Sequence, residues 1–316
     1  MTKNIDNRKI KTHKSAVKNW WNSDKTKKWQ HGGMYKKDFK NHQHVLFRKN
    51  RVLELVSDLN LPKNAKVLEL GFGGAELAGD LLKSGYEYTG IDISKHLVNH
   101  AKKKYFKFLK NKKAKFINLS LEDKYNFKSN YFDLVIEVGA FQYAGNLTKT
   151  LNEIKRVLKV QGFFLMAQSN MYSFNNLMNF RRFVKALIWF FQKKNFFYNY
   201  SLSFKDILLS TELTFFKKYK NSKFMNFKFM TNYSEVWKYK IIKRLFSIGK
   251  MKKLLKDNQF TVKKVSGGPF IYNSKENTTT ITSMLNKTLQ FLCDLKFPLI
   301  IRFADSGIIL ASKKSL

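Results

Sequence analysis

The sequence predicts an α/β fold, in which a mostly parallel sheet carries helices on both faces. Apolar strands and helices alternate over residues 66–168, a pattern typical of parallel strands joined by helical crossovers. The first strand ends in a glycine-rich turn, Gly71–Gly74, and the second strand ends at Asp92. Such a turn lets the backbone approach a ligand closely, and an acidic residue about 20 positions later can reach a ribose. The sequence therefore predicts a nucleotide-like cofactor at one edge of the sheet.

Seven strands and the helices between them are expected in chain order. The strands cover residues 66–70, 86–91, 114–119, 131–138, 163–168, 260–265 and 307–312. The helices cover residues 75–84, 95–110 and 147–158. A further helix over 45–59 precedes the first strand, because apolar residues recur there at helical spacing until Pro62 ends the pattern. The carboxyl ends of the parallel strands are then expected to form the ligand-binding edge.

The positions of the glycines decide between cofactors. A dinucleotide-binding turn has the pattern G-x-G-x-x-G, whose third glycine lets the helix pack tightly beneath a pyrophosphate. Gly71 and Gly73 fit the first two positions, but Glu76 stands at the third. Its carboxylate falls where a diphosphate would lie near the helix start. The turn therefore argues against a dinucleotide.

Three segments resemble class I S-adenosylmethionine-dependent methyltransferases. Residues 69–75 resemble the first motif of that family, acidic-x-Gly-x-Gly-x-Gly, with alanine in place of the last glycine. Residues 131–140 resemble the fourth strand, with its Phe-Asp start and a small residue at its active-site end. Residues 153–162 resemble the motif Glu-Ile-x-Arg-Val-Leu-Lys-Pro-Gly-Gly, although Val160 and Gln161 replace the proline and the first glycine. Their order and spacing resemble the ubiquinone/menaquinone-type branch.

The resemblance implies a Rossmann-like fold, a doubly wound and mostly parallel seven-stranded sheet with an antiparallel last strand. Residues 308–314 resemble that closing strand. A helical aromatic insertion is expected before it, where the family commonly inserts substrate-binding helices. The implied cofactor is S-adenosyl-L-methionine, which has no phosphate and needs close backbone, a nearby acidic residue and a pocket that tolerates positive charge.

The resemblance also implies which residues hold the methionine and ribose parts of this cofactor. Glu69 and Gly71, with Gly73 in the same turn, are expected at the methionine end. Asp92 is expected to accept both ribose hydroxyls. The alternative role for Asp92 is that of a helix N-cap, a place that Asp and Ser often fill. Ser94 could cap the helix instead, which would leave Asp92 for the cofactor.

The adenine is expected beside the loops that follow the second and third strands. Ile93 is expected to pack against the ring, and Leu121 and Glu122 to meet its edge. All three residues fall at or just past the carboxyl ends of expected strands. One locus would therefore collect them with the glycine-rich turn.

The sequence offers only weak candidates for catalysis. Many relatives have a His-His pair after the fourth strand, but this chain has Phe141–Tyr143 there. Tyr143, Glu137 and His31 remain as candidates for orienting or deprotonating a substrate hydroxyl, and a tyrosine titrates near 10 and would need help. A carbon or amine nucleophile would need only proximity to the methyl group.

Neither a metal site nor a disulfide is expected. His96 and His100 have the i, i+4 spacing of some metal ligands, but no third ligand accompanies them. Cys293 is the single cysteine, which excludes internal disulfides and fits a reducing compartment. Residues 1–19 lack the apolar region of a secretion signal. A cytoplasmic protein is therefore expected.

The net charge of +38 has two interpretations. A basic surface attracts nucleic acids and anionic membranes through its long-range field and counterion release. Abundant Lys, Phe, Ile and Asn with only 3 Pro is also the residue usage that an AT-rich genome imposes on any protein. No arginine-aromatic recognition motif stands among the lysine runs, so composition bias is the favoured interpretation.

Four segments are expected along the chain. Residues 1–44 form a mobile basic tail, over 1–19, and an aromatic cap that folds over the cofactor or packs on the core from outside. Residues 45–170 form the cofactor-binding core. Residues 171–257 form the helical insertion, expected as a substrate lid, and 258–316 the last strands.

The insertion also bears on membranes. Arg181–Phe191 is a candidate interfacial helix, because basic residues flank an aromatic face there. Its longest apolar run, Ala186–Phe191, is far below the ~20 residues that span a bilayer. No transmembrane segment is expected, and peripheral contact with a membrane surface stays open.

The resemblance implies methyl transfer to a small-molecule acceptor. A lipid-linked or glycan-linked molecule is one form that this acceptor could take. The acceptor atom, O, N or C, and the oligomeric state have no signal in the sequence. One alternative is an RNA methyltransferase that uses the basic surface, although residues 168–171 do not supply the Asn/Asp-Pro-Pro-aromatic motif of base-methylating enzymes. The other alternative is a non-catalytic relative that keeps the fold as a binding module.

Overall fold

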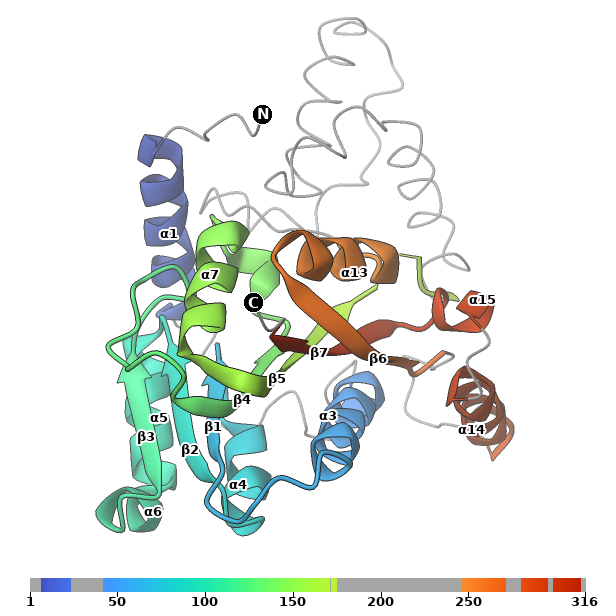
Figure 1. Cartoon of the computed structure of the whole chain (residues 1–316), viewed down its shortest axis with the longest axis horizontal. Coiled ribbons are helices and arrows are strands. Elements are labelled where there is room, and N and C mark those ends of the chain that lie inside the picture. Colours follow the sequence, from blue (N-terminus) through green and yellow to red (C-terminus); the bar gives the residue numbers. More distant parts are fainter. Residues whose placement is uncertain are drawn as a thin grey trace, which may run out of the picture.

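A seven-stranded sheet forms the centre of the computed structural model, which describes residues 7–23, 42–170, 172–174, 246–270, 280–294 and 298–313 (Figure 1). In chain order the strands are β1 (Lys66–Leu70), β2 (Glu87–Asp92), β3 (Ala114–Asn118), β4 (Phe132–Val138), β5 (Leu158–Ser169), β6 (Phe260–Gly268) and β7 (Ser306–Lys313). Across the sheet they lie in the order β3-β2-β1-β4-β5-β7-β6.

The order of strands reverses beside β1. From β1 the chain moves outward through β2 to β3, and it then returns to place β4 on the other side of β1, all in parallel. Ligands of such sheets bind outside the carboxyl ends of the strands at this reversal. The last strand, β7, enters between β5 and β6 and is antiparallel to both. The predicted seven-stranded, mostly parallel sheet with an antiparallel last strand is therefore confirmed.

Two apolar layers, one on each face, hold the helices to the sheet. One layer packs α3 (His42–Ser57), α4 (Glu76–Lys83) and α5 (Lys95–Lys104) against alternate strand residues such as Val67 and Ile136. The other packs α7 (Leu147–Val157) and α13 (Ile248–Asp257) against the intervening residues, such as Leu68 and Val135. Figure 1 shows α7 and α13 on one side of the sheet and α3 and α4 on the other. Burial on both faces explains why these strands are continuous apolar runs.

Some element boundaries differ from the expected ones. The helix expected over 95–110 is two helices, α5 and α6 (Phe106–Lys110), which meet at Tyr105. Tyr105 leaves helical geometry because its hydroxyl donates to the carbonyl of Ala75 at 2.8 Å and its ring stacks on Phe116. β5 begins at Leu158 rather than at 163, directly after α7.

The amino-terminal segment corrects a prediction. A mobile tail was expected over residues 1–19, but the structure has a helix, α1 (Asn7–Trp21). His13 and Val17, which lie one turn apart, are buried, and the hydroxyl of Ser94 donates to the carbonyl of Trp21 at 2.8 Å. Tertiary contacts of this kind stabilise a helix whose sequence is too polar to reveal it. The remaining part of the predicted cap, residues 24–41, lies outside the described residues.

The core sheet resumes earlier than expected after the long interruption. Asn170 and Phe246 form an isolated parallel bridge, and α13 packs against β6 and β7. Residues 246–257 therefore belong to the core and not to the insertion. The rest of the expected substrate lid, apart from residues 172–174, lies outside the described residues, and so does the candidate interfacial helix at 181–191. Within the described ranges, no helix combines the length and the apolar character needed to cross a membrane.

The carboxyl-terminal part adds two more helices, α14 (Thr280–Asp294) and α15 (Pro298–Ile301). Both lie near the β6 edge of the sheet (Figure 1). Leu289 and Ile301 pack with Phe270 and Ala304 in a small apolar cluster of their own. Both helices therefore lie at the β6 edge of the sheet, opposite the β3 edge.

Candidate active site

A cavity of about 310 Å³ opens at the carboxyl ends of β1, β2 and β4, where the strand order reverses. Residues from α1 and α3 complete its wall. Eight of the ten residues predicted from the sequence line this cavity: Glu69, Gly71, Gly73, Asp92, Ile93, Leu121, Glu122 and Tyr143. They are collected because the ends of parallel strands meet at one edge of the sheet.

The glycine-rich turn brings bare backbone to the cavity. Gly71 and Gly73 both have left-handed backbones, with φ of 67° and 55°. A Cβ on Gly71 would lie 2.4 Å from the Cβ of Ala140, so the close approach of the loops after β1 and β4 requires glycine there. A Cβ on Gly73 would meet nothing within 4 Å. The turn is therefore tight at Gly71 and open towards the cavity at Gly73.

Asp92 joins this turn to the start of α5. Its carboxylate accepts from the backbone N–H of Gly73 at 3.0 Å and from that of Ser94 at 2.8 Å. Ser94 is the N-cap of α5, since its side chain accepts from the N–H of Leu97 at 3.3 Å. Burial raises the pKa of Asp92 to about 6, although both hydrogen bonds act in the opposite direction. The cap role thus falls to Ser94, and Asp92 presents its carboxylate to the cavity wall.

Glu69 is the second buried acid of the wall. It is 3% exposed, and its carboxylate accepts from the hydroxyl of Tyr88 at 2.6 Å. Burial is the main reason why the pKa of Glu69 rises to about 8, and the nearby Asp92 and Glu76 raise it further. Two carboxyl groups with raised pKa values therefore share one wall. A positively charged ligand would stabilise the ionised form of both groups.

The loop after β3 supplies the third acidic residue. Glu122 is buried, and its two oxygens accept from the backbone N–H groups of Gly145 at 2.7 Å and Asn146 at 3.0 Å. The neighbouring Leu121 accepts through its carbonyl from the hydroxyl of Tyr125 at 2.8 Å. These bonds tie the loops after β3 and β4 together, and they fix the two side chains at the end of the cavity nearest β3.

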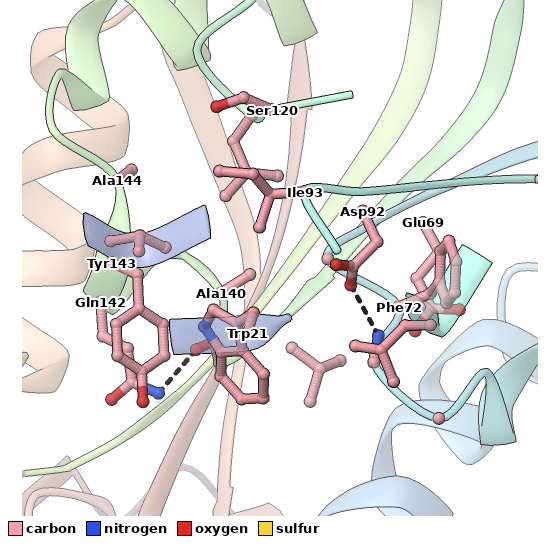
Figure 2. A pocket seen from close by; sticks show the side chains of 18 of the residues that line it. Trp21, Glu69, Phe72, Asp92, Ile93, Ser120, Ala140, Gln142, Tyr143 and Ala144 are labelled. Carbon is pink, nitrogen blue, oxygen red and sulfur yellow. Dashed lines mark hydrogen bonds between the residues drawn. The ribbon is translucent and has the colours of Figure 1, made fainter. Parts of the chain in front are cut away.

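Of the catalytic candidates, Tyr143 lies in the cavity wall. It ends the 3-10 turn η2 (Phe141–Tyr143), and its carbonyl accepts from the Nε2 of His13 at 2.9 Å. Its ring meets that of Trp21 edge-on, with 5.7 Å between the ring centroids. Figure 2 shows Asp92 and Tyr143 on opposite sides of the pocket, with Trp21 between them in this view. Tyr143 therefore lies across the cavity from the glycine-rich turn.

Glu137 has a different place from the one expected for a substrate-facing base. It is 0% exposed and outside the cavity wall. Its carboxylate accepts from the backbone N–H groups of Ala140 and Phe141 and from the Nε2 of Gln168. Burial raises its pKa to about 7. Glu137 is thus a residue that holds the loop after β4 in shape, which corrects the prediction.

The remaining expectations concern His31 and metals. His31 lies outside the described residues. In the described part of the chain, no three His, Cys, Asp or Glu side chains are grouped so that they could hold a metal ion.

The sequence did not single out several residues of the wall. They come from α1, α3, η2 and the end of β5, and they are Lys14, Val17, Val45, Arg48, Gln142 and Ser169. Trp21 was expected only as one of several aromatics of a cap. Val17 and Trp21 are one turn apart on α1, and Val45 and Arg48 are one turn apart on α3. Helical spacing is the only signal that links each pair, and it does not show which face meets the cavity.

The central part of the chain is similar in sequence to known proteins. Residues 68–166 match the family model of the methyltransferase domain. The putative methyltransferase YqeM of Bacillus subtilis is 25% identical over 111 residues, which are 34% of this chain and 44% of that protein. The uncharacterized protein MJ1252 of Methanocaldococcus jannaschii is 31% identical over 129 residues, 39% of this chain and 46% of that protein. The chain thus spans less than half the length of these curated relatives.

Two solved structures resemble the whole fold. One is a chain of the complex between the Haloferax volcanii Trm112 methyltransferase activator and a putative methyltransferase, with a TM-score of 0.52 and 16% identity, over 94% of this chain and 98% of that one. The other is a putative sarcosine dimethylglycine methyltransferase from Galdieria sulphuraria, with a TM-score of 0.51 and 13% identity, over 85% and 86%. Residues 68–166 therefore match a methyltransferase domain, and the fold of the chain is that of these two structures.

Proposed function

We propose that this protein transfers the methyl group of S-adenosylmethionine to a small-molecule acceptor in the cavity at the strand reversal. The observation that carries the proposal is the pairing of Gly73, whose missing side chain leaves open space, with Asp92, whose carboxylate lies in the same wall. Backbone with no side chain and two buried acids, Asp92 and Glu69, suit a ligand that has no phosphate and carries positive charge. The residues present therefore fit this cofactor.

We assign the parts of the cofactor to the wall residues as follows. Gly71, Gly73 and Glu69 hold the methionine end. A carboxylate offers about four acceptor positions, and Asp92 uses two of them for backbone N–H groups, so two remain for the ribose hydroxyls. The adenine lies towards β3, against three further residues: Ile93, Leu121 and Glu122.

The chain's own contribution to the reaction is position and exclusion of water. When bound, the cofactor supplies an electrophilic methyl group, and displacement at that group depends mainly on near-attack geometry. Val17 and Trp21 of α1 form an apolar part of the wall that keeps water from the reacting atoms. Tyr143 lies across the cavity from the turn, and we assign its hydroxyl to orienting the acceptor.

We also assign the protein to the ubiquinone/menaquinone-type branch of small-molecule methyltransferases, on the order and spacing of its three motifs. The departure at Phe141–Tyr143, where many relatives have a His-His pair, indicates an acceptor that does not need a histidine base at this point. The sequence thus supports the branch and a change of acceptor within it.

Calorimetric titration with S-adenosylhomocysteine tests the proposal before an acceptor is known. We expect binding in the micromolar range and, after addition of labelled S-adenosylmethionine and a metabolite extract, transfer of label to a small molecule. No binding by the wild type would refute the proposal and favour a non-catalytic binding module.

RNA methylation is a second candidate, because the net charge of +38 favours polyanions. An RNA-binding surface that neutralises several phosphates loses roughly 10³-fold or more in affinity between 50 mM and 200 mM salt. Filter binding of bulk RNA over this range, followed by a search for label in RNA, separates this candidate from the small-molecule one. Label in RNA would displace the proposed function.

The affinity for S-adenosylmethionine is expected to rise with pH between about 6 and about 8. The pKa of Asp92 is raised to about 6 and that of Glu69 to about 8. A bound cation lowers both pKa values, so binding of the cofactor releases protons from these carboxyl groups. The affinity therefore rises with pH until the pH reaches the pKa that each group has in the unliganded protein. The rise is at most about tenfold per pH unit for each proton released. Titrations at several pH values measure the slope.

Two controls identify the source of this slope. S-adenosylhomocysteine lacks the sulfonium charge and is expected to give a shallower dependence. Glu69→Gln removes the group that titrates near pH 8 and is expected to flatten the upper part of the curve. An equal slope for both ligands and both proteins would contradict the assignment of the charge to this wall.

Trp21→Ala is expected to weaken binding of S-adenosylhomocysteine by about tenfold, because it removes an aromatic side chain that covers the cavity and packs on Tyr143. The matched control is Phe106→Ala, which removes an aromatic side chain that is 65% exposed and outside the wall. Equal affinities of the two variants would show that α1 does not cover bound cofactor.

A further inference from the structure

The charges of the cavity wall are divided between its two sides. The acidic side chains come from the ends of β1 and β2, the loop after β3 and the start of α4, and they are Glu69, Asp92, Glu122 and Glu76, of which Glu76 pairs with Lys104. The basic side chains come from the helices α1 and α3, and they are Lys14 and Arg48. The acidic side matches the positive charge of the cofactor. The basic side has no counterpart in the cofactor contacts proposed above.

Of the two basic side chains, Arg48 is the one whose charge is available to a ligand. Lys14 forms an ion pair with Asp123. Arg48 is partly buried, and among the described residues it has no hydrogen bond or ion pair. Its charge lies near Glu137, whose pKa is raised mainly by burial and lowered in part by Arg48. The oxygens of Glu137, however, are already bonded to Ala140, Phe141 and Gln168.

Arg51, one turn later on α3, shows the contrast. Its Nε donates to the hydroxyl of Ser266 at 2.8 Å, and its Nη1 donates to the carboxylate of Glu54 at 2.9 Å. Arg51 is not part of the cavity wall. The helix therefore carries one arginine with structural partners and one that lines the cavity without them in the described structure.

The guanidinium of Arg48 lies beside the end of β4. A Cβ placed on Gly139 would be 3.9 Å from its Nη1 and 4.0 Å from its Nη2. Gly139 directly precedes Ala140, the residue that touches the glycine-rich turn at Gly71. Arg48 is thus on the β4 side of this contact. Gln142 belongs to the same part of the wall, and its Nε2 donates to the carbonyl of Gly139 at 2.7 Å (Figure 2).

An arginine in such a position has a defined chemical preference. Its planar guanidinium has five donors and binds carboxylate or phosphate in a bidentate manner. Such charge-assisted pairs are about twice as strong as neutral hydrogen bonds. Apolar side chains line the same cavity, among them Val17, Trp21 and Val45. A ligand with an anionic head and an apolar body satisfies both features.

We propose that Arg48 binds the anionic group, a carboxylate or a phosphate, of the methyl acceptor, so that the acceptor is an acidic small molecule with an apolar body. This inference rests on the proposed function. It adds a specificity-determining residue and a substrate class to it. The carboxylate of the cofactor itself is the other source of the same chemistry, and the experiment separates the two.

The test uses the full chain saturated with S-adenosylhomocysteine and three aromatic probes: benzoate, phenyl phosphate and the neutral benzamide. We expect at least one anionic probe to bind at least about tenfold more tightly than benzamide in calorimetric or NMR titrations, as a charge-assisted bidentate pair implies. Arg48→Gln is expected to abolish this preference and to leave the affinity for S-adenosylhomocysteine unchanged. Arg48→Lys keeps the charge without the bidentate fork and should retain part of the preference.

Arg51→Gln is the matched control, because it removes the same charge from the same helix outside the cavity, and it should keep the preference. Equal binding of anionic and neutral probes, or binding of none, would overturn the inference. So would a tenfold loss of S-adenosylhomocysteine affinity in Arg48→Gln with unchanged affinity for 5′-methylthioadenosine, which lacks the carboxylate, since Arg48 would then serve the cofactor. Failure of the wild type to bind S-adenosylhomocysteine refutes the proposed function itself and is therefore a distinct result.

Discussion

Asp92→Ala is expected to weaken binding of S-adenosylhomocysteine by about a hundredfold. The carboxylate of Asp92 holds the N–H groups of Gly73 and Ser94, and we assign its remaining acceptor positions to the ribose hydroxyls. A hydrogen bond to a charged group contributes about 1.5–3 kcal/mol, so loss of the ribose contacts alone accounts for a factor of this size. The alanine also leaves the glycine-rich turn without its link to α5.

Calorimetric titration of wild type and variant measures this loss, and a matched acid provides the control. Asp133 also accepts from a backbone N–H, that of Lys66 at 2.8 Å, and pairs with Lys159 at 2.7 Å, but it lies outside the cavity wall. Asp133→Ala should therefore change stability without changing cofactor affinity. If Asp92→Ala bound as tightly as Asp133→Ala, the ribose would have to be held elsewhere.

Alanine substitutions at the two glycines of the turn are expected to have different effects. In Gly71→Ala the new Cβ would lie 2.4 Å from that of Ala140, and the backbone has φ of 67°. Overpacking and a left-handed backbone together predict a loss of roughly 2–4 kcal/mol in the free energy of unfolding. In Gly73→Ala the new Cβ meets nothing within 4 Å, so only the backbone cost of about 1 kcal/mol remains.

For cofactor affinity we expect the larger effect from Gly73→Ala, because its new Cβ occupies cavity space that we assign to the cofactor. We expect Gly73→Ala to stay folded and to lose most of its affinity for S-adenosylhomocysteine. Urea unfolding gives the stabilities, and calorimetry gives the affinities. A folded Gly73→Ala protein with wild-type affinity would move the methionine end of the cofactor away from the turn.

Local sequence signals predicted the sheet and the side of the site that follows β1, β2 and β3. The turn at Gly71 and Gly73 and the acid at Asp92 are short motifs with a fixed spacing, and strand alternation determines that their ends meet at one edge. The predicted loop residues after β3 line the same cavity for this reason. Motif and alternation are both readable along the chain without knowledge of distant contacts.

The other side of the site depends on contacts that the sequence does not encode locally. Lys14 and Arg48 come from helices that precede the core, and only tertiary packing brings them over the cavity. Glu137 is the converse case, a residue that the sequence placed in the site and the structure does not. Its carboxylate turns back to the N–H groups of its own loop. A carboxylate at a strand end can face either a ligand or the backbone, and its sequence position is the same in both cases.

The bridge between Asn170 and Phe246 gives the protein a modular junction. The point at which the chain leaves the core after β5 and the point at which it returns before α13 therefore lie side by side. A graft inserted between these two points would have to keep this bridge and also the contact of Phe174, whose N–H donates to the carbonyl of Phe303 at 2.9 Å. The hydrogen bonds of the glycine-rich turn and of Asp92 would stay as they are in such a graft, because they are made by residues 73–94.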